Sequence, residues 1–281
     1  MTGVGGNPQH LDRPRSLGTS LATGRRPLAS ALGSLAMARC LALLLVALLS
    51  LCGTGWGAAD ESAQALKDRA KAYYYGLGGE RNLAKALQLY LRAADLGDAE
   101  AQYIGGGMLF KGLGAPQDTA RAFRLLYQAA INGKSSAVSE QLIGQAFLLG
   151  SGLPKNYTKA ARWYTQAAEN GNREAQNELG FLYFLGRGVE QDLEKGGDYF
   201  LMAARGGLAV AQYNVGVMYA TGRGVDGVDL SRAYAWLNVA ATGGHSPARA
   251  ARDSLEPMLD RSQLLEAQRL TEELMATLQE R

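Results

Sequence analysis

Cysteine and histidine are scarce in this sequence. The 281 residues include two cysteines, Cys40 and Cys52, and two histidines, His10 and His245. After residue 60 there is no cysteine and only one histidine. In that part of the chain the scarcity excludes disulfide frameworks, cysteine nucleophiles and zinc sites built from Cys and His. A Ser-His-Asp triad there could use only His245.

An excess of one charge is also missing from most of the chain. The whole sequence has 29 basic and 26 acidic residues, a formal net charge of +3. Residues 1–59 hold five of the basic side chains and one of the acidic, which leaves 24 basic and 25 acidic residues in 60–281. Nucleic-acid-binding domains carry a basic patch or stripe. We therefore expect no nucleic-acid partner.

The apolar run at residues 40–51 is too short to cross a membrane. A transmembrane helix needs about 20 apolar residues, whereas a run of this length suits the centre of a secretory signal. Arg39 supplies the basic flank, and a stretch of small residues ends at Ala59, where we expect cleavage. The sequence predicts a leader at 1–59 with Met37 as its true start, and no membrane span in the mature form.

Three other interpretations of the leader remain open. Cys52 could carry a lipid anchor, although Leu51 before it is unlike the small residues that lipoprotein signals use. Arg25-Arg26 could belong to a twin-arginine signal, although the following residues do not continue that motif. Residues 1–36 are rich in Arg and Ser, as in an organelle transit peptide. We expect a periplasmic or secreted bacterial protein, with a membrane-anchored lipoprotein or an organelle-targeted protein as alternatives.

Glycine, in contrast, is abundant and periodic. There are 36 glycines, about double the usual share. A Gly-x-Gly pair recurs at spacings of 36, 38, 36 and 36 residues, beginning at Gly76, Gly112, Gly150, Gly186 and Gly222. An Ala-Ala pair followed three residues later by Gly recurs in the same phase, beginning at Ala93, Ala129, Ala167, Ala203 and Ala240. Periods of this length are typical of stacked repeat architectures.

Each unit is predicted to form two antiparallel helices. The first helix ends at the first glycine of Gly-x-Gly, where a left-handed residue closes a helix. The second begins at an Asn or Asp, whose side-chain oxygen accepts a free backbone N–H. These N-caps are Asn82, Asp118, Asn156, Asp192 and Asp229. One such pair cannot bury its apolar face alone, so the units must stack.

The fourth unit departs from the pattern. It has Gly196-Gly197 where the other units have alanine and a second residue. A glycine inside a helix costs about 1 kcal/mol relative to alanine. We therefore expect this unit to be the softest joint, and we expect Gly197→Ala to raise the melting temperature.

The repeat resembles the Sel-one-like repeat (SLR) family, a relative of the tetratricopeptide repeat. The best match is A-Q-N-E-L-G-F-L-Y-F-L-G-R-G-V at 175–189, joined by K-A-A-R-W-Y-T-Q-A-A-E-N-G at 159–171. The resemblance implies five repeats at 60–248 and C-terminal capping helices at 249–281, with Ser246-Pro247 as N-cap and first residue. It implies an all-α fold, a right-handed α-solenoid of stacked antiparallel helix pairs.

The resemblance also implies where a partner binds. By analogy with tetratricopeptide repeats, the first helices line a concave face, where aromatic side chains can grip an extended peptide and Gln or Asn can bond to its backbone. An equally open interpretation is that half of these residues form the core between units. The candidate partner-binding residues are Tyr74, Tyr75, Tyr103, Phe110, Lys111, Gln141, Gln145, Asn177, Phe181, Phe184 and Tyr213.

Signals for catalysis are weak. Residues 222–227 spell G-x-G-x-x-G, but a predicted helix precedes them where a dinucleotide site needs a strand. His245 lies in a predicted turn before a capped helix. Some similar repeat proteins are linked to β-lactam binding or hydrolysis, but they carry a cysteine pair in each unit, and this chain also lacks S-x-x-K and K-T-G.

We therefore expect an exported, non-catalytic scaffold that binds a protein or peptide partner, with no catalytic residue, cofactor or metal. Two alternatives remain. One is a cell-wall or β-lactam hydrolase, and the other is a recruiting subunit of an envelope secretion or assembly machine.

Overall fold

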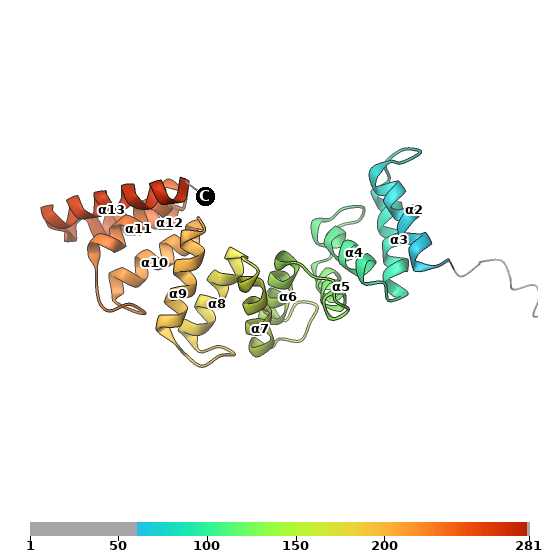
Figure 1. Ribbon diagram of the computed structural model, residues 1–281, viewed down its shortest axis with the longest axis horizontal. Coiled ribbons are helices and arrows are strands. Elements are labelled where there is room, and N and C mark those ends of the chain that lie inside the picture. Colours follow the sequence, from blue (N-terminus) through green and yellow to red (C-terminus); the bar gives the residue numbers. More distant parts are fainter. Residues whose placement is uncertain (1–60, 280–281) are drawn as a thin grey trace, which may run out of the picture. The chain divides into compact units, whose positions relative to one another are not determined.

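A computed structural model describes residues 61–279. The expected leader at 1–59, with Met37, Cys52 and the cleavage site at Ala59, lies outside the described residues. Those that are described form twelve α-helices and one short 3₁₀ helix, with no strand among them (Figure 1). The predicted all-α fold of stacked helix pairs is confirmed.

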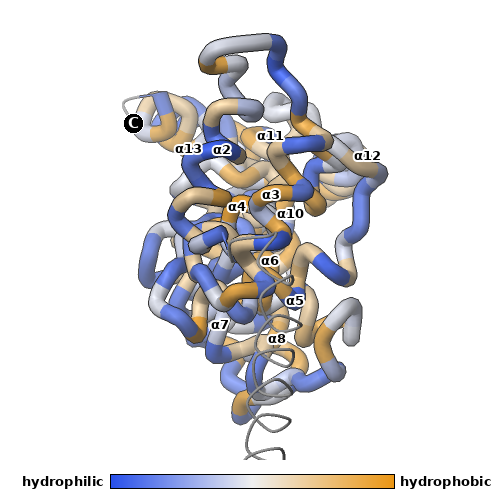
Figure 2. The backbone as a smooth tube through the Cα atoms, turned by 90° about the vertical axis from the view of Figure 1, so that its right-hand side faces the viewer, coloured by the Kyte–Doolittle hydropathy of each residue, from blue (hydrophilic) through white to orange (hydrophobic). Residues whose placement is uncertain are grey.

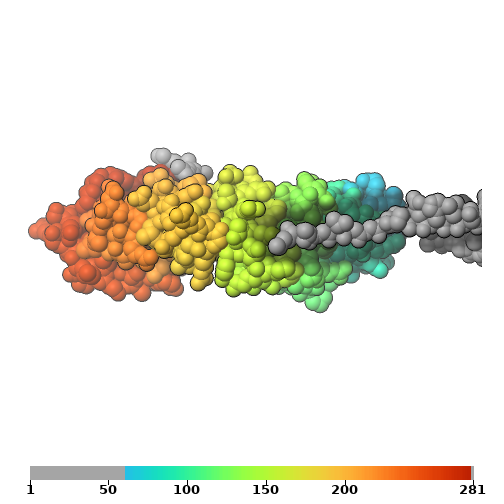
Figure 3. Space-filling view, turned by 90° about the horizontal axis from the view of Figure 1, so that it is seen from below, coloured from blue at the N-terminus to red at the C-terminus, as the bar shows by residue number. Residues whose placement is uncertain are grey.

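Ten of the helices form five successive pairs, here called units 1 to 5, and each helix is 13 residues long. Their bounds are α2 Ala63–Tyr75 and α3 Leu83–Asp95, α4 Ala99–Lys111 and α5 Thr119–Ile131, α6 Ala137–Leu149 and α7 Tyr157–Glu169, α8 Arg173–Leu185 and α9 Leu193–Arg205, and α10 Ala209–Thr221 and α11 Leu230–Thr242. The two helices of each unit pack on one another, and the units follow in sequence order (Figure 3).

Three further elements follow the fifth unit. They are α12 Ser246–Leu255, η1 Glu256–Met258 and α13 Arg261–Gln279. Both α12 and α13 pack against α11. The start of α12 differs from the prediction, because the N-cap is His245, whose Nδ1 accepts the Ala248 N–H at 3.2 Å. His245 therefore has a capping role that the sequence pattern assigned to Ser246.

Capping residues set the helix boundaries as predicted. Each first helix ends at a left-handed glycine, with φ between +62° at Gly186 and +76° at Gly150. Each second helix begins after the predicted Asn or Asp, whose side-chain oxygen accepts the backbone N–H three residues later, as Asn82 does from Lys85 at 2.9 Å. Capping residues therefore fix the end of each first helix and the start of each second helix.

Small residues let the two helices of a unit approach closely. The eighth residue of four first helices is glycine, and each faces one large side chain of the second helix. A Cβ added at these glycines would lie 2.7 to 3.0 Å from that side chain, the pairs being Gly106 with Leu126, Gly144 with Tyr164, Gly180 with Phe200 and Gly216 with Leu237. Orange and blue segments alternate along the backbone in Figure 2, as expected for helices that bury one face.

The second glycine of each Gly-x-Gly pair makes a contact between units. In units 2 to 5 a Cβ at this glycine would collide with the backbone at the start of the preceding unit's second helix, as Gly152 would with Ala120. Gly78 of unit 1 has no preceding unit, and a Cβ there would meet nothing within 4 Å. These glycines therefore serve the stacking of units as well as the turn.

The two glycines inside α9 are closely packed. A Cβ at Gly197 would lie 2.8 Å from the carbonyl oxygen of Gly224 and 2.9 Å from the sulfur of Met218. A Cβ at Gly196 would collide with the ring of Phe184. This close packing argues against the expectation that Gly197→Ala raises the melting temperature, because the added methyl group would have to displace Gly224 or Met218.

The loosest joint between units lies elsewhere. The helices α5 and α6 pack less closely than any other two helices that join successive units. One residue separates the closing glycine from the next first helix in the other joints, for example Asp98 after Gly97. Lys134, Ser135 and Ser136 intervene here, which accounts for the spacing of 38. The joint between units 2 and 3 is therefore the least closely packed of those described, while the expectation that unit 4 is the softest joint stays a prediction.

A change of residue type accompanies this loose joint. The fourth residue of the other stacked first helices is a buried glutamine that donates to a carbonyl of the preceding helix, as Gln102 does to Ala94 at 3.3 Å, Gln176 to Ala168 and Gln212 to Ala204. Unit 3 has Glu140, and an ionised carboxylate can only accept. It accepts from Ser135, Gln166 and Asn170 at 2.8 to 2.9 Å. The bond from α6 to the preceding helix is therefore absent.

Candidate binding groove

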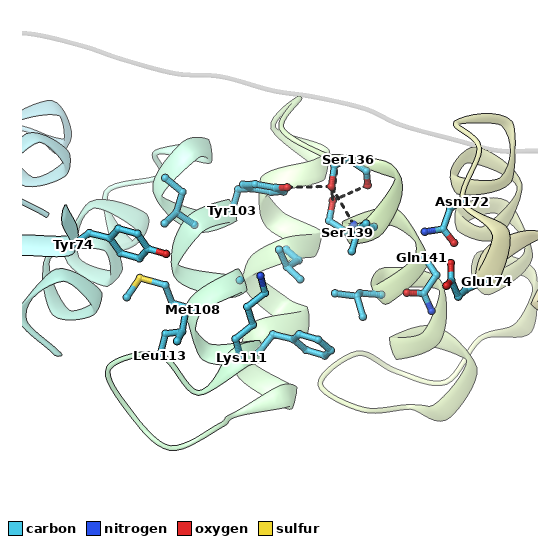
Figure 4. A pocket seen from close by; sticks show the side chains of 16 residues that line it. Tyr74, Tyr103, Met108, Lys111, Leu113, Ser136, Ser139, Gln141, Asn172 and Glu174 are labelled. Atoms are coloured by element: carbon cyan, nitrogen blue, oxygen red, sulfur yellow. Dashed lines mark hydrogen bonds between the residues drawn. The ribbon is translucent and has the colours of Figure 1, made fainter. Parts of the chain in front are cut away.

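A groove of about 660 Å³ lies along the first helices of units 1 to 4. Most of its lining comes from α4 and α6, with Tyr74 contributed by α2 and Glu174 by α8 (Figure 4). Its apolar lining includes Ile104, Met108 and Leu142. The groove spans the joint at which the three residues 134–136 hold α5 and α6 apart, so the loose packing there contributes to the open space.

Five of the eleven candidate residues line this groove, namely Tyr74, Tyr103, Phe110, Lys111 and Gln141. The other six, Tyr75, Gln145, Asn177, Phe181, Phe184 and Tyr213, lie outside it. Tyr75 is 68% exposed and makes an edge contact with the ring of Tyr74, at 5.0 Å between ring centroids. Gln145 is half-buried. The row of predicted residues is therefore divided into two groups.

Two of the outlying aromatic residues pack on a core residue. The rings of Phe181 and Phe184 both contact Phe200, at centroid distances of 5.0 and 5.2 Å. Phe200 itself is buried, and Phe181 remains 39% exposed. These side chains join α8 to α9, so the structure gives them a packing role whether or not a partner touches them.

The fifth residues of the first helices differ in whether their side chains already have a partner within the protein. Asn177 is buried and its side-chain oxygen accepts from Asn214 at 2.8 Å. The ring of Tyr213 contacts the ring of His245 in a tilted arrangement, at 5.0 Å between ring centroids. In the groove, by contrast, the side-chain amide of Gln141 has no hydrogen-bond partner among the residues described. Its amide can therefore serve a bound molecule.

The same register in units 1 and 2 is also occupied. The buried ammonium group of Lys67 lies 2.9 Å from the carboxylates of both Asp98 and Glu100 on the next unit. The hydrogen bond to Asp98, followed by the one to Glu100, raises the pKa of Lys67. The Tyr103 hydroxyl donates to the Ser136 hydroxyl at 3.0 Å across the loose joint. These contacts tie neighbouring units together.

Two opposite charges flank the groove. Lys111 is exposed and its side chain points into the groove, while Glu174 is exposed beside Gln141 and Asn172 at the α8 end (Figure 4). Neither charge has an ion pair or hydrogen bond among the described residues. The groove thus offers an unpaired cation towards α4 and an unpaired anion towards α8.

A glycine that packing does not require forms part of the groove wall. Three consecutive glycines lie inside α4: a Cβ at Gly106 would press on Leu126 at 3.0 Å, one at Gly105 would touch Leu91 at 3.4 Å, and one at Gly107 would meet nothing within 4 Å. The other first helices carry a side chain at this register, Lys71, Gln145, Phe181 or Val217. The cost of about 1 kcal/mol for an interior glycine is therefore not offset by a close contact at Gly107.

Sequence reasoning missed several lining residues, among them Gly107, Val138 and Glu174. Val138 is 62% exposed, although valine is apolar. The run Gly105–Gly107 was the available signal, but a sequence does not show which of three glycines faces empty space. Within residues 61–279, no three His, Cys, Asp or Glu side chains are grouped to hold a metal ion. No helix in this range has the length and apolar character of a membrane span.

Comparison with known proteins identifies the repeat. The family model described as the Sel1 repeat matches five segments, at 63–98, 99–134, 137–172, 173–208 and 209–245. The crystal structure of a Sel1 repeat protein from Oxalobacter formigenes is similar, with 28% identity over 78% of this chain and 86% of that one and a TM-score of 0.57.

Two further solved structures are more distant. A protective antigen of uropathogenic Escherichia coli strains, with an SLR fold, has 23% identity, covers 77% of this chain and 62% of its own, and has a TM-score of 0.37. A Sel1 repeat protein from Klebsiella pneumoniae has 22% identity and a TM-score of 0.36. The match covers 69% of this chain and 93% of that one. No curated protein matches the chain.

Proposed function

The chain belongs to the Sel1 repeat family, and on that premise we propose that it is an exported, non-catalytic scaffold that binds a polypeptide partner along its first helices. Sel1 repeats build scaffolds for protein–protein interaction. Beyond this general role, we propose where the partner binds, that the protein is exported and that it does not catalyse a reaction. The observation that carries it is the groove over α4 and α6, where apolar side chains, an amide without a partner and two unpaired charges lie together.

This combination suits a polypeptide. Apolar pockets take side chains, and a few convergent polar groups fix the orientation of the bound chain. The Gln141 amide can both donate to and accept from a peptide backbone. Among the lining residues Glu174 is the only carboxylate, and there is no histidine. The groove therefore holds no pair of carboxylates and no carboxylate–histidine pair for general acid–base catalysis, and its other charged group, Lys111, lies towards α4, away from Glu174 (Figure 4).

Photo-crosslinking in intact cells tests the site. A photoreactive phenylalanine is placed at position 111 in the groove and, as a matched control, at position 162 on the exposed surface of α7. Both positions carry an exposed basic residue in the native chain. We expect one defined protein adduct from position 111 and none of it from position 162. The same adduct from both positions, or from 162 alone, would remove the first-helix face as the binding site.

Export is tested separately. The chain with a C-terminal tag is expressed in a bacterium, and the fractions are probed for the tag. We expect the tag in the periplasm or medium, on a product whose amino-terminal residue lies near Asp60. A tagged product that stays in the cytoplasm at full length would contradict the proposed export. Turnover of the β-lactam nitrocefin, or release of peptidoglycan fragments by the purified protein, would contradict the absence of catalysis.

A further inference from the structure

We infer that the groove selects a polypeptide segment by two features, an aliphatic side chain placed against Gly107 and an acidic side chain paired with Lys111. The inference rests on the proposed function, because it specifies the partner of the same site. It assigns to Gly107 a role in specificity.

The first feature, the preference for an aliphatic side chain, follows from the space over Gly107. A Cβ at this position would meet nothing within 4 Å, so the missing side chain leaves room that no neighbour fills. The groove that includes Gly107 is also lined by aliphatic side chains, with Ile104 from α4 and Val138 and Leu142 from α6. Val138 is largely exposed and would lose its contact with water when an aliphatic side chain enters. A glycine allows another chain to approach the helix backbone closely.

The second feature, the preference for an acidic side chain, follows from the unpaired charges of the groove. Lys111 points into the groove from the α4 side and has no partner among the described residues, so a carboxylate on the bound segment would complement it. Glu174 at the α8 side is likewise unpaired and favours a basic residue at that end of the segment. The order of charges therefore fixes one direction along the groove. Complementary charges of this kind set register and exclude wrong partners.

A library of random heptapeptides displayed on phage, panned against the purified 281-residue chain, provides the probe. We expect enriched peptides to share an aliphatic residue next to Asp or Glu. One enriched peptide is then synthesised with a fluorescent label, and its affinity is measured by anisotropy. Gly107→Trp fills the space, and we expect it to weaken binding at least tenfold.

Matched variants separate binding from folding. Val217→Trp places the same side chain at the same register of α10, outside the groove, and we expect the affinity to be unchanged within twofold. Gly107→Ala replaces glycine by a residue of higher helix propensity without filling the space. We expect the melting temperature of this variant to rise by about 2–4 °C. If Gly107→Trp loses helical circular dichroism, Gly107→Leu replaces it as the test of binding.

A charge exchange tests the second feature. Lys111→Glu is expected to weaken binding of the acidic peptide about tenfold, and the peptide with Lys in place of its acidic residue should recover affinity for this variant. Equal binding to the native chain and to Gly107→Trp would overturn the inference, as would enriched peptides without an acidic residue.

Failure of this inference differs from failure of the proposed function. If no peptide is enriched and the native chain self-associates in sedimentation while Gly107→Trp does not, the occupant is a second copy and the inference falls. An adduct at position 111 that persists in the Gly107→Trp variant would preserve the proposed function and remove the role of Gly107.

Discussion

Helices α4 and α9 both contain consecutive glycines, but the space beside those glycines differs. In α9 the space next to Gly196 and Gly197 is filled by Phe184 and by the backbone of Gly224. In α4 the space next to Gly107 is empty and forms part of a groove. The same unfavourable residue therefore serves close packing in one region and leaves room for a ligand in the other.

This difference gives a rule that can be checked. A helical glycine belongs to the core when a Cβ would collide with a neighbour, and it is a candidate for function when a Cβ would meet nothing. Substitution by alanine separates the two cases, because it destabilises the first and stabilises the second.

Gly152→Ala should have the largest effect. The added Cβ collides with the backbone of Ala120 in the preceding unit, and the residue has φ +71°. Overpacking and a left-handed alanine together should lower the free energy of unfolding by ~2–4 kcal/mol, as measured by urea denaturation. Gly78→Ala is the control, with φ +80° but no neighbour, and should lose only about 1 kcal/mol. Equal losses would show that inter-unit contact does not matter.

Asn214→Ala extends the comparison from space to hydrogen bonds. The substitution leaves the buried side-chain oxygen of Asn177 without its partner, which should cost about 1–3 kcal/mol. Gln141→Ala at the register equivalent to Asn177 should change the free energy of unfolding by less than about 0.5 kcal/mol, since Gln141 has no partner to lose. Thermal unfolding of both variants measures the difference. A larger loss at Gln141 would mean that its amide is structural.

Gly197→Ala tests the closely packed glycines of α9 directly. The gain of about 1 kcal/mol in helix propensity is opposed by the collision with Gly224 and Met218, which should cost about 1–3 kcal/mol. We expect a net loss of about 1 kcal/mol in urea denaturation. A rise in stability would show that the contact between α9 and the loop after α10 relaxes easily.

Gly107→Ala is the counterpart in α4. With no neighbour within 4 Å of the new Cβ, the variant should gain up to about 1 kcal/mol in the free energy of unfolding. The same denaturation series measures it. Gly106→Ala, one residue away and 3.0 Å from Leu126, should not gain, which makes it the control for a general effect of alanine in this helix.

Glu178→Gln should have the smallest effect, and one that depends on pH. Burial raises the pKa of the Glu178 carboxyl, against an opposing hydrogen bond from Asn177. The folded state therefore favours the protonated form, and its stability falls as the pH rises from the ordinary glutamate value of 4.5 through the raised pKa. Gln cannot ionise, so the variant should be more stable than the native chain at pH 7. The two should converge below pH 4.5.

The local parts of the fold could be predicted from the sequence, because caps and glycines act on their own helix. Asn82 and its equivalents accept the expected N–H groups, and Gly76 and its equivalents close the first helices. The sign of Gly197→Ala could not be predicted, because Gly224 touches α9 from the next unit. Residue type alone also could not distinguish Gln141, which has no partner, from Asn177, whose partner is 37 residues away.

Five of the eleven candidate residues lie in the groove, and six lie outside it. The tetratricopeptide analogy placed five residues in the groove because the register of the first helices is regular. It did not predict that the groove is limited to units 1 to 4. The groove depends on the insertion at 134–136, which lies at the loosely packed joint, and on Gly107, which leaves space beside α4, and neither effect can be read from residue type alone.

The insertion at 134–136 has a consequence for how the chain comes apart. In a linear array each unit is coupled only to its neighbours, and the weakest interface divides the array into cooperative blocks. Units 1 and 2 should melt as one block and units 3 to 5 with the carboxyl-terminal helices as another. Hydrogen exchange would then show two plateaus of protection whose border falls at Ser135. A ligand seated across that border would fuse both transitions into a single one.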